Sequence, residues 1–167
     1  MDTPCAVRLA WTHASVAAMK LDKRVILVTG GGSGIGASTV QRLREEGAVT
    51  VSLDLNIDRA NASEPALGLA CDVTDEVSVV AALDEVVARF GSVYGAVLNA
   101  GIALEVPLHE TTLQQWNSVL AVNLTGAFLV AKHTITRMTG PGALVFHASM
   151  SGLVATADEP AYCASKA

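Results

Sequence analysis

The sequence predicts an α/β fold in which a parallel sheet lies between two layers of helices. Short apolar runs typical of buried strands alternate along the chain with segments whose apolar residues recur at helical spacing. The first run, Val25 to Val28, leads into a glycine-rich turn and a predicted helix over 37–46. The chain has 167 residues, the length of one domain, and 51% of them are hydrophobic but only 4% aromatic. We therefore expect a core packed mainly from Ala, Val and Leu.

Charge, cysteines and histidines argue against several classes of function. A net charge of −5 provides no basic surface for nucleic acid. The three cysteines and four histidines are scattered without the spacing of metal ligands, so we expect no metal site. A sparse, odd number of cysteines also fits reduced thiols in a cytoplasmic protein. No continuous apolar run reaches the length of a membrane span, so we expect no membrane partner.

The glycine-rich turn follows the pattern Thr-Gly-x-x-x-Gly-x-Gly and lies where a pyrophosphate site needs it, between a buried strand and a helix. Glycines let the backbone come close to the phosphates, and the start of the helix offers free N–H groups and a positive dipole end. The turn therefore predicts a dinucleotide site. Its expected cofactor-binding residues are Gly30, Ser33, Gly34, Ile35 and Gly36.

Asp54 closes a second predicted strand, Val49 to Leu53, and indicates which dinucleotide binds. A carboxylate at this point can accept hydrogen bonds from both hydroxyls of the adenosine ribose, and it repels the 2′-phosphate of NADP. Neither Ser33 nor Leu55, the residue after Asp54, is basic, which agrees with this preference. We therefore expect Asp54 and Leu55 to contact NAD, with NADP disfavoured. In the alternative interpretation, Asp54 caps a loop.

The third predicted strand, Leu67 to Cys71, leads directly into Asp72 and Val73. Thr74 is the expected N-cap of the helix that follows, and acidic residues in the first turn of this helix favour its dipole. Residues 56–66, before the third strand, are polar and contain a proline, which predicts a loop or a short irregular helix.

A fourth strand is predicted over 93–98 and a fifth over 143–148, and both end in candidate site residues. In an open parallel sheet, ligands bind at the carboxyl ends of the strands. A long helix is expected between these strands, over about 113–138, and its apolar middle contains Asn123, whose amide needs partners. The candidates that follow the two strands are Asn99, Ala100, Gly101 and Ser149.

Tyr162 and Lys166 form a Tyr-x-x-x-Lys pattern at the end of the chain. Residues four apart lie on one face of a helix, so the phenol and the ammonium group point into the same space. A free phenol has a pKa of about 10 and is a poor base at neutral pH, whereas a nearby cation favours the phenolate. The pair therefore predicts a group that exchanges a proton with a substrate oxygen. The alternative is a pair on the surface of a helix.

The sequence resembles the short-chain dehydrogenase/reductase family. The resemblance rests on the glycine turn, the Asp-Val pair, the Asn-Ala-Gly segment, the Asn in the long helix, the Ser segment and the Tyr-x-x-x-Lys segment. The resemblance covers residues 19–167. It implies a Rossmann-like three-layer sandwich with parallel strand order 3-2-1-4-5, lacking the C-terminal strands of the complete family fold. Two positions depart from the family pattern: Leu98 replaces the first Asn of Asn-Asn-Ala-Gly, and Tyr94 stands where an Asp is usual.

The resemblance also implies roles for the candidate residues. Asp72 and Val73 contact the adenine, and the segment Asn99, Ala100, Gly101 leaves room beside the cofactor. Four residues are expected to be catalytic: Asn123 holds a relay water, Ser149 holds the substrate oxygen, Tyr162 is the acid/base, and Lys166 lowers the pKa of Tyr162. Tyr162 and Lys166 are also expected to contact the cofactor, Lys166 through the nicotinamide ribose.

The implied function is NAD-dependent interconversion of a secondary alcohol and a ketone by hydride transfer, with a small-molecule substrate. The alternative is a non-catalytic NAD-binding or interaction fragment, inactive because the C-terminal substrate-binding part is absent. We expect residues 1–18 to be a poorly packed N-terminal extension and residues 19–167 to be an incomplete dinucleotide-binding domain. Complete family members form homo-oligomers, and the oligomeric state of this chain stays open.

Overall fold

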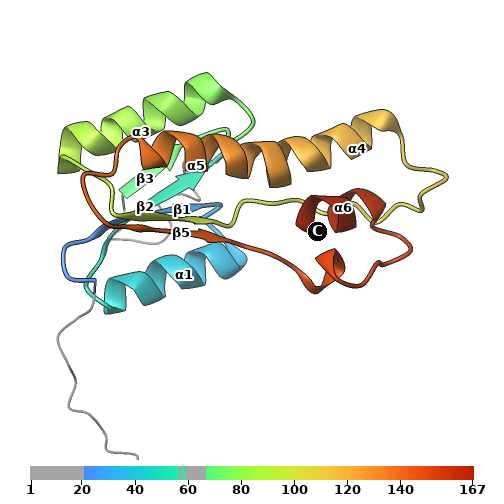
Figure 1. Ribbon diagram of the computed structural model, residues 1–167, viewed down its shortest axis with the longest axis horizontal. Helices are drawn as coiled ribbons and strands as arrows, with labels where there is room; N and C mark the ends of the chain where they lie inside the picture. The colour runs from blue at the N-terminus through green and yellow to red at the C-terminus, as the bar shows by residue number, and fades with distance from the viewer. Residues whose placement is uncertain (1–20, 57, 59–66) are drawn as a thin grey trace, which may run out of the picture.

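The computed structural model describes residues 21–56, 58 and 67–167, and within them the chain forms a five-stranded parallel sheet (Figure 1). The strand order is β3-β2-β1-β4-β5, which confirms the predicted order. The predicted extension 1–18 and most of the predicted loop 56–66 lie outside the described residues. The strands are β1 (Val25–Thr29), β2 (Val49–Asp54), β3 (Leu67–Ala70), β4 (Gly95–Leu98) and β5 (Ala143–Phe146).

Helices cover both faces of the sheet, as Figure 1 shows. Helix α1 (Gly34–Glu45) lies on one face, and α3 (Glu76–Phe90) and α5 (Ala127–Ile135) lie side by side on the other. A shorter helix, α6 (Pro160–Lys166), packs against α4 (Leu113–Leu120) beyond the end of the sheet. The arrangement is the predicted three-layer α/β sandwich.

The core lies between the sheet and these helices and consists of aliphatic residues. All five residues of β1 are buried, as expected for a central parallel strand covered on both faces. Leu27 and Leu53 of the sheet and Leu83 and Val130 of the helices are fully buried. These residues explain how a chain with few aromatic residues forms a continuous core.

One continuous helical segment, Leu113–Ile135, contains α4, a π-helical turn η1 (Ala121–Gly126) and α5. It ends three residues before the predicted Met138. By length and composition the segment is apolar enough to cross a membrane, although polar residues interrupt its apolar run. Length and apolar composition are weak evidence for a membrane span, because helices that cover a sheet also have them. Helix α5 is such a helix, since it packs on β4 and α3.

Helix α3 begins one residue later than expected, because Asp75 and not Thr74 is its N-cap. The Asp75 carboxylate accepts a hydrogen bond from the Val77 N–H at 3.0 Å. Thr74 instead donates its N–H and its hydroxyl to Oδ1 of Asp72, at 2.9 and 2.7 Å. The predicted Thr74 cap is therefore wrong, since the Asp72 carboxylate already holds the Thr74 hydroxyl.

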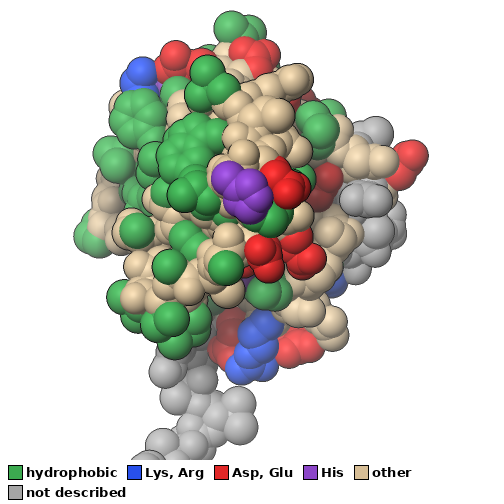
Figure 2. All heavy atoms as spheres, turned by 90° about the vertical axis from the view of Figure 1, so that its right-hand side faces the viewer, with side chains coloured by type: hydrophobic (Ala, Val, Ile, Leu, Met, Phe, Trp, Pro, Cys, Tyr) green, Lys and Arg blue, Asp and Glu red, His purple; other side chains and the backbone are tan. Residues whose placement is uncertain are grey.

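Strand β5 forms one edge of the sheet and is poorly covered. It pairs with β4 alone among the described strands, and Val145 and Phe146 are 53% and 57% exposed. Apolar side chains also gather on the face around α4 and α6 (Figure 2). Leu113, Leu124 and Leu153 are all more than half exposed.

Glu76 links α3 to α5 by an ion-pair cluster whose contribution depends on pH. Its Oε1 lies 2.7 Å from Lys132 Nζ and 2.7 Å from His133 Nε2. The hydrogen bond from Lys132, followed by that from His133, lowers the pKa of Glu76 below its ordinary 4.5. A lowered pKa in the folded state stabilises the fold above the unfolded pKa, and this stabilisation is lost as the pH falls through the lowered value.

We therefore expect Glu76→Gln to lower the melting temperature slightly at neutral pH, because exposed ion pairs contribute little. The difference from the wild type should disappear at a pH below the lowered pKa of Glu76, where the wild-type carboxyl is protonated as well. Thermal unfolding followed by circular dichroism at both pH values measures this. An equal difference at both would show that the charge of Glu76 is not responsible.

Candidate cofactor and active site

A cavity of about 550 Å³ opens at the carboxyl ends of the strands. Every predicted cofactor-binding residue except Gly36 lines it: Gly30, Ser33, Gly34, Ile35, Asp54, Leu55, Asp72, Val73, Asn99, Ala100, Gly101, Tyr162 and Lys166. The sequence pattern missed other lining residues, namely Leu53, Cys71, Ile102, Ala103, Val122 and His147. Most of these are apolar wall residues whose position only the folded chain determines.

The glycine turn has the backbone geometry that its sequence predicts. Gly30 and Gly34 have φ of +63° and +52°, in the left-handed region that favours glycine. Gly36 is crowded, because a Cβ added there would lie 2.0 Å from the carbonyl oxygen of Gly30. The first helical bond of α1 joins Ala37 N–H to Ser33 C=O at 3.0 Å, so the N–H groups of residues 34–36 precede the helical ladder. These groups can bind an anion at the mouth of the cavity.

Asp54 holds the turn from the end of β2 and lines the cavity. Its Oδ2 accepts a hydrogen bond from Gly32 N–H at 3.2 Å, and its Oδ1 accepts one from Asn56 N–H at 3.1 Å. Asp54 therefore does cap the loop after β2, through its contact with Asn56, as the alternative interpretation of this residue predicts. This contact does not exclude ligand binding, since a carboxylate has about four lone-pair sites.

Thr29 is the first residue of the glycine pattern, and it supports the cavity through hydrogen bonds that the pattern does not predict. Its hydroxyl oxygen accepts hydrogen bonds from the N–H groups of Asn99 and Ala100, both at 2.9 Å. Asn99 Nδ2 donates in return to the carbonyl oxygens of Thr29, at 3.1 Å, and Gly30, at 3.4 Å. These bonds join the end of β4 to the glycine turn.

Burial changes the chemistry of Cys71, which lies at the end of β3 in the cavity wall. Desolvation raises the pKa of its thiol to about 11. The thiol is therefore neutral at physiological pH and acts as a small apolar wall residue.

Asn123 lies in η1, is 5% exposed and does not line the cavity. Its Oδ1 accepts a hydrogen bond from Ile102 N–H at 2.8 Å. Its Nδ2 donates to the Ile102 carbonyl and to Ser165 Oγ, both at 2.9 Å. Both hydrogens of the Asn123 amide are thus used to join the long helix to the loop after β4 and to α6. A relay water at Asn123 would have to bind a different atom of this residue.

Tyr162 and Lys166 project from α6 into the same cavity. The Lys166 Nζ atom lies 5.7 Å from the centre of the Tyr162 ring and donates a hydrogen bond to the His147 carbonyl at 2.8 Å. Burial lowers the pKa of Lys166. The predicted pair therefore shares one space, with the ammonium group close to the phenol.

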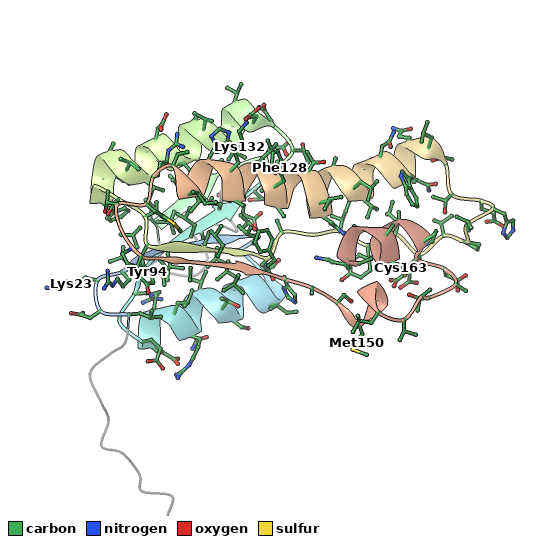
Figure 3. All side chains as sticks on the ribbon, in the orientation of Figure 1. Lys23, Tyr94, Phe128, Lys132, Met150 and Cys163 are labelled. Carbon is green, nitrogen blue, oxygen red and sulfur yellow. The ribbon has the colours of Figure 1, made fainter. Side chains whose placement is uncertain are left out.

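Ser149, the predicted substrate-holding residue, is not among the residues that line the cavity. It caps the short 3₁₀ turn η2 (Met150–Gly152), and its Oγ accepts a hydrogen bond from Ser151 N–H at 3.2 Å. Figure 3 shows this turn, marked by Met150, below α6, which is marked by Cys163. The capping contact directs the hydroxyl of Ser149 to the backbone of its own turn.

A comparison with protein-family models places this arrangement. The model described as short chain dehydrogenase matches residues 24–167. The chain belongs to the short-chain dehydrogenase family. Membership agrees with the parallel order of the sheet and with the cavity at the carboxyl ends of its strands.

Characterised short-chain dehydrogenases are similar in sequence and in structure. D-threitol dehydrogenase of Mycolicibacterium smegmatis is 43% identical over 88% of this chain and 60% of its own length. Cis-4-hydroxycyclohexanecarboxylate dehydrogenase of Sinomonas cyclohexanicum is 43% identical over 87% of this chain and 62% of its own length. A crystal structure of NAD⁺-bound xylitol dehydrogenase has a TM-score of 0.83 at 36% identity and covers 88% of this chain and 61% of that one. The chain thus spans about 60% of the length of the curated relatives.

The two departures from the short-chain dehydrogenase pattern lie at opposite ends of β4, and neither residue lines the cavity. Leu98 is 4% exposed and packs in the core at the end of β4. Tyr94 precedes β4 and stacks against Arg24, whose guanidinium carbon lies 4.6 Å from the ring centre. Figure 3 shows Tyr94 at the opposite end of the sheet from α6.

Proposed function

We propose that this chain carries the cofactor site and the proton-transfer pair of an NAD-dependent oxidoreductase that interconverts a secondary alcohol and a ketone. The observation that carries the proposal is that Tyr162 and Lys166 line the same cavity as the glycine turn and Asp54. A small-molecule substrate fits the family, since its named relatives act on D-threitol and on cis-4-hydroxycyclohexanecarboxylate. The sparse cysteines support a cytoplasmic location.

The residues present fit a nicotinamide dinucleotide. The N–H groups that precede the α1 ladder and the Gly30 turn would hold the pyrophosphate. Asp54 would accept hydrogen bonds from the adenosine ribose, and Asp72 and Val73 would contact the adenine. The negative charge of Asp54 opposes a 2′-phosphate, which supports NAD over NADP.

Bound in this cavity, the nicotinamide supplies or accepts the hydride. Tyr162 moves the proton between its phenol oxygen and the substrate oxygen. The ammonium group of Lys166, close to the ring, would stabilise the negative charge that forms on the phenol oxygen when the proton leaves. Lys166 also reaches the nicotinamide ribose in this proposal.

Asp54→Ala tests the cofactor site. We expect NAD to bind about tenfold more weakly to the variant, because two ribose hydrogen bonds are lost. The affinity for NADP relative to that for NAD should rise. Isothermal titration calorimetry with both dinucleotides measures this. Because Asp54→Ala also removes the contacts to Gly32 and Asn56, Asp54→Asn, which keeps an acceptor oxygen, is the matched variant. Equal affinity of the wild type for NAD and NADP would contradict the assignment.

The position of Ser149 favours a second candidate, a non-catalytic NAD-binding or interaction module. Its hydroxyl caps η2, and the residue does not line the cavity, so this arrangement does not direct Ser149 at a substrate. NAD binding without turnover of any secondary alcohol would support this candidate. Turnover that depends on Tyr162 would exclude it.

A further inference from the structure

His147 follows β5 and connects three parts of the site. Its N–H donates to the Leu98 carbonyl at 3.1 Å, which extends the pairing of β4 and β5. Its carbonyl accepts the hydrogen bond from Lys166 Nζ at 2.8 Å. Its imidazole Nδ1 lies 2.8 Å from Asn99 Oδ1. The residue is half-buried and lines the cavity, but nothing in the proposed function uses its imidazole.

The surroundings of Asn99 determine which nitrogen of His147 carries a hydrogen. Asn99 Nδ2 faces two carbonyl oxygens, those of Thr29 and Gly30, which can only accept. The amide oxygen of Asn99 therefore faces His147 and needs a donor. This contact is a hydrogen bond when Nδ1 of His147 carries the hydrogen, so the orientation of the Asn99 amide selects the Nδ1–H tautomer of the ring.

The Asn99 amide lies against two glycines of the turn, Gly30 and Gly36. A Cβ added at Gly36 would lie 2.7 Å from Asn99 Nδ2, and one added at Gly30 would lie 3.3 Å from the same atom. A rotation of this amide would therefore break its bonds to the carbonyls of Thr29 and Gly30 and disturb the backbone against which it packs. The donor on His147 opposes that rotation.

We propose that His147 is a positioning residue for the dinucleotide: its imidazole holds Asn99, and through Asn99 the glycine turn, while its carbonyl holds Lys166. This inference rests on the proposed function, because the turn is the proposed pyrophosphate site. It assigns the imidazole a role in affinity without contact to a reacting atom.

The test compares His147→Leu, which removes the donor, with His147→Asn, whose amide nitrogen can occupy the position of Nδ1. We expect His147→Leu to bind NADH about fivefold more weakly in calorimetry, the loss of one hydrogen bond, and His147→Asn to stay within about twofold of the wild type. His109→Leu, at an exposed histidine outside the cavity, is the control and should bind as the wild type does.

A second ligand separates positioning from general loss of structure. Adenosine lacks both phosphates and the nicotinamide half, so its affinity, measured by NMR titration, should be equal for His147→Leu and the wild type. A merely destabilised chain would bind both ligands more weakly. Unchanged NADH affinity in His147→Leu, or an equal loss in His147→Asn, would overturn the proposal.

A third readout requires neither cofactor nor variant. The imidazole ¹⁵N spectrum of the wild-type chain should show the Nδ1–H tautomer at neutral pH, and the Nε2–H tautomer would overturn the inference. If the wild type binds no dinucleotide, the proposed function fails, and the positioning role in affinity fails with it. The tautomer would then report only whether the contact between His147 and Asn99 exists.

Discussion

Replacing Gly36 with alanine should weaken dinucleotide binding by up to about a hundredfold and lower the stability of the fold. The added Cβ would lie 2.0 Å from the Gly30 carbonyl oxygen and 2.7 Å from Asn99 Nδ2. The first contact is with backbone, so no rotamer change relieves it and the turn or α1 must shift. Overpacking of this kind costs about 3 kcal/mol, which corresponds to a hundredfold change in an equilibrium constant.

Two other glycines provide controls for Gly36→Ala. Gly34 has a φ of +52° but no atom within 4 Å of an added Cβ, so Gly34→Ala should show only the left-handed strain of about 1–2 kcal/mol. Gly140 has neither strain nor a close neighbour, and Gly140→Ala should behave as the wild type. Calorimetry with NAD and thermal unfolding of all three variants measure the series. Equal effects at Gly36 and Gly34 would show that crowding is not the cause.

Tyr162→Phe should reduce the oxidation of secondary alcohols by a factor of about 10² to 10⁴, the usual contribution of a positioned acid or base. The variant keeps the ring beside Lys166 and loses only the hydroxyl, so NAD affinity should stay within about twofold. The measurement is NADH formation at 340 nm with a panel of secondary alcohols, together with calorimetry for NAD.

Tyr94→Phe is the matched control for Tyr162→Phe, because Tyr94 lies outside the cavity and stacks on Arg24. It loses the same hydroxyl and should keep the wild-type rate. Full activity in Tyr162→Phe would remove Tyr162 from the mechanism. A parallel loss of NAD affinity would indicate that the hydroxyl binds the cofactor and has no acid/base role.

The family resemblance was sufficient to predict the strand order, and the motifs predicted most, but not all, of the residues that line the cavity. The glycine turn, Asp54 and the pair Tyr162 and Lys166 follow directly after buried strands or lie on one helix face, so local spacing positions them. The contact of His147 with Asn99 joins residues 48 positions apart in the sequence and depends on the register of β4 and β5. No local sequence pattern therefore predicts it.

Competition between short-range hydrogen bonds explains the remaining differences. The Thr74 hydroxyl can cap a helix or bond to Asp72, and Ser149 can face the cavity or cap η2; only the folded backbone decides between such alternatives. The raised pKa of Cys71 could not be predicted either, because it depends on the burial of the thiol in the folded chain.

The π-helical turn at Ala121–Gly126 has a consequence for the long helix that contains it. A π turn contains one residue more than an α turn, so every side chain after it is rotated by about 100° relative to an uninterrupted α-helix. The segment before the turn faces α6, and the segment after it faces α3 and β4. The single extra residue thus lets one helix present two differently directed faces, one to the Tyr162 helix and one to the sheet, without a break in the chain.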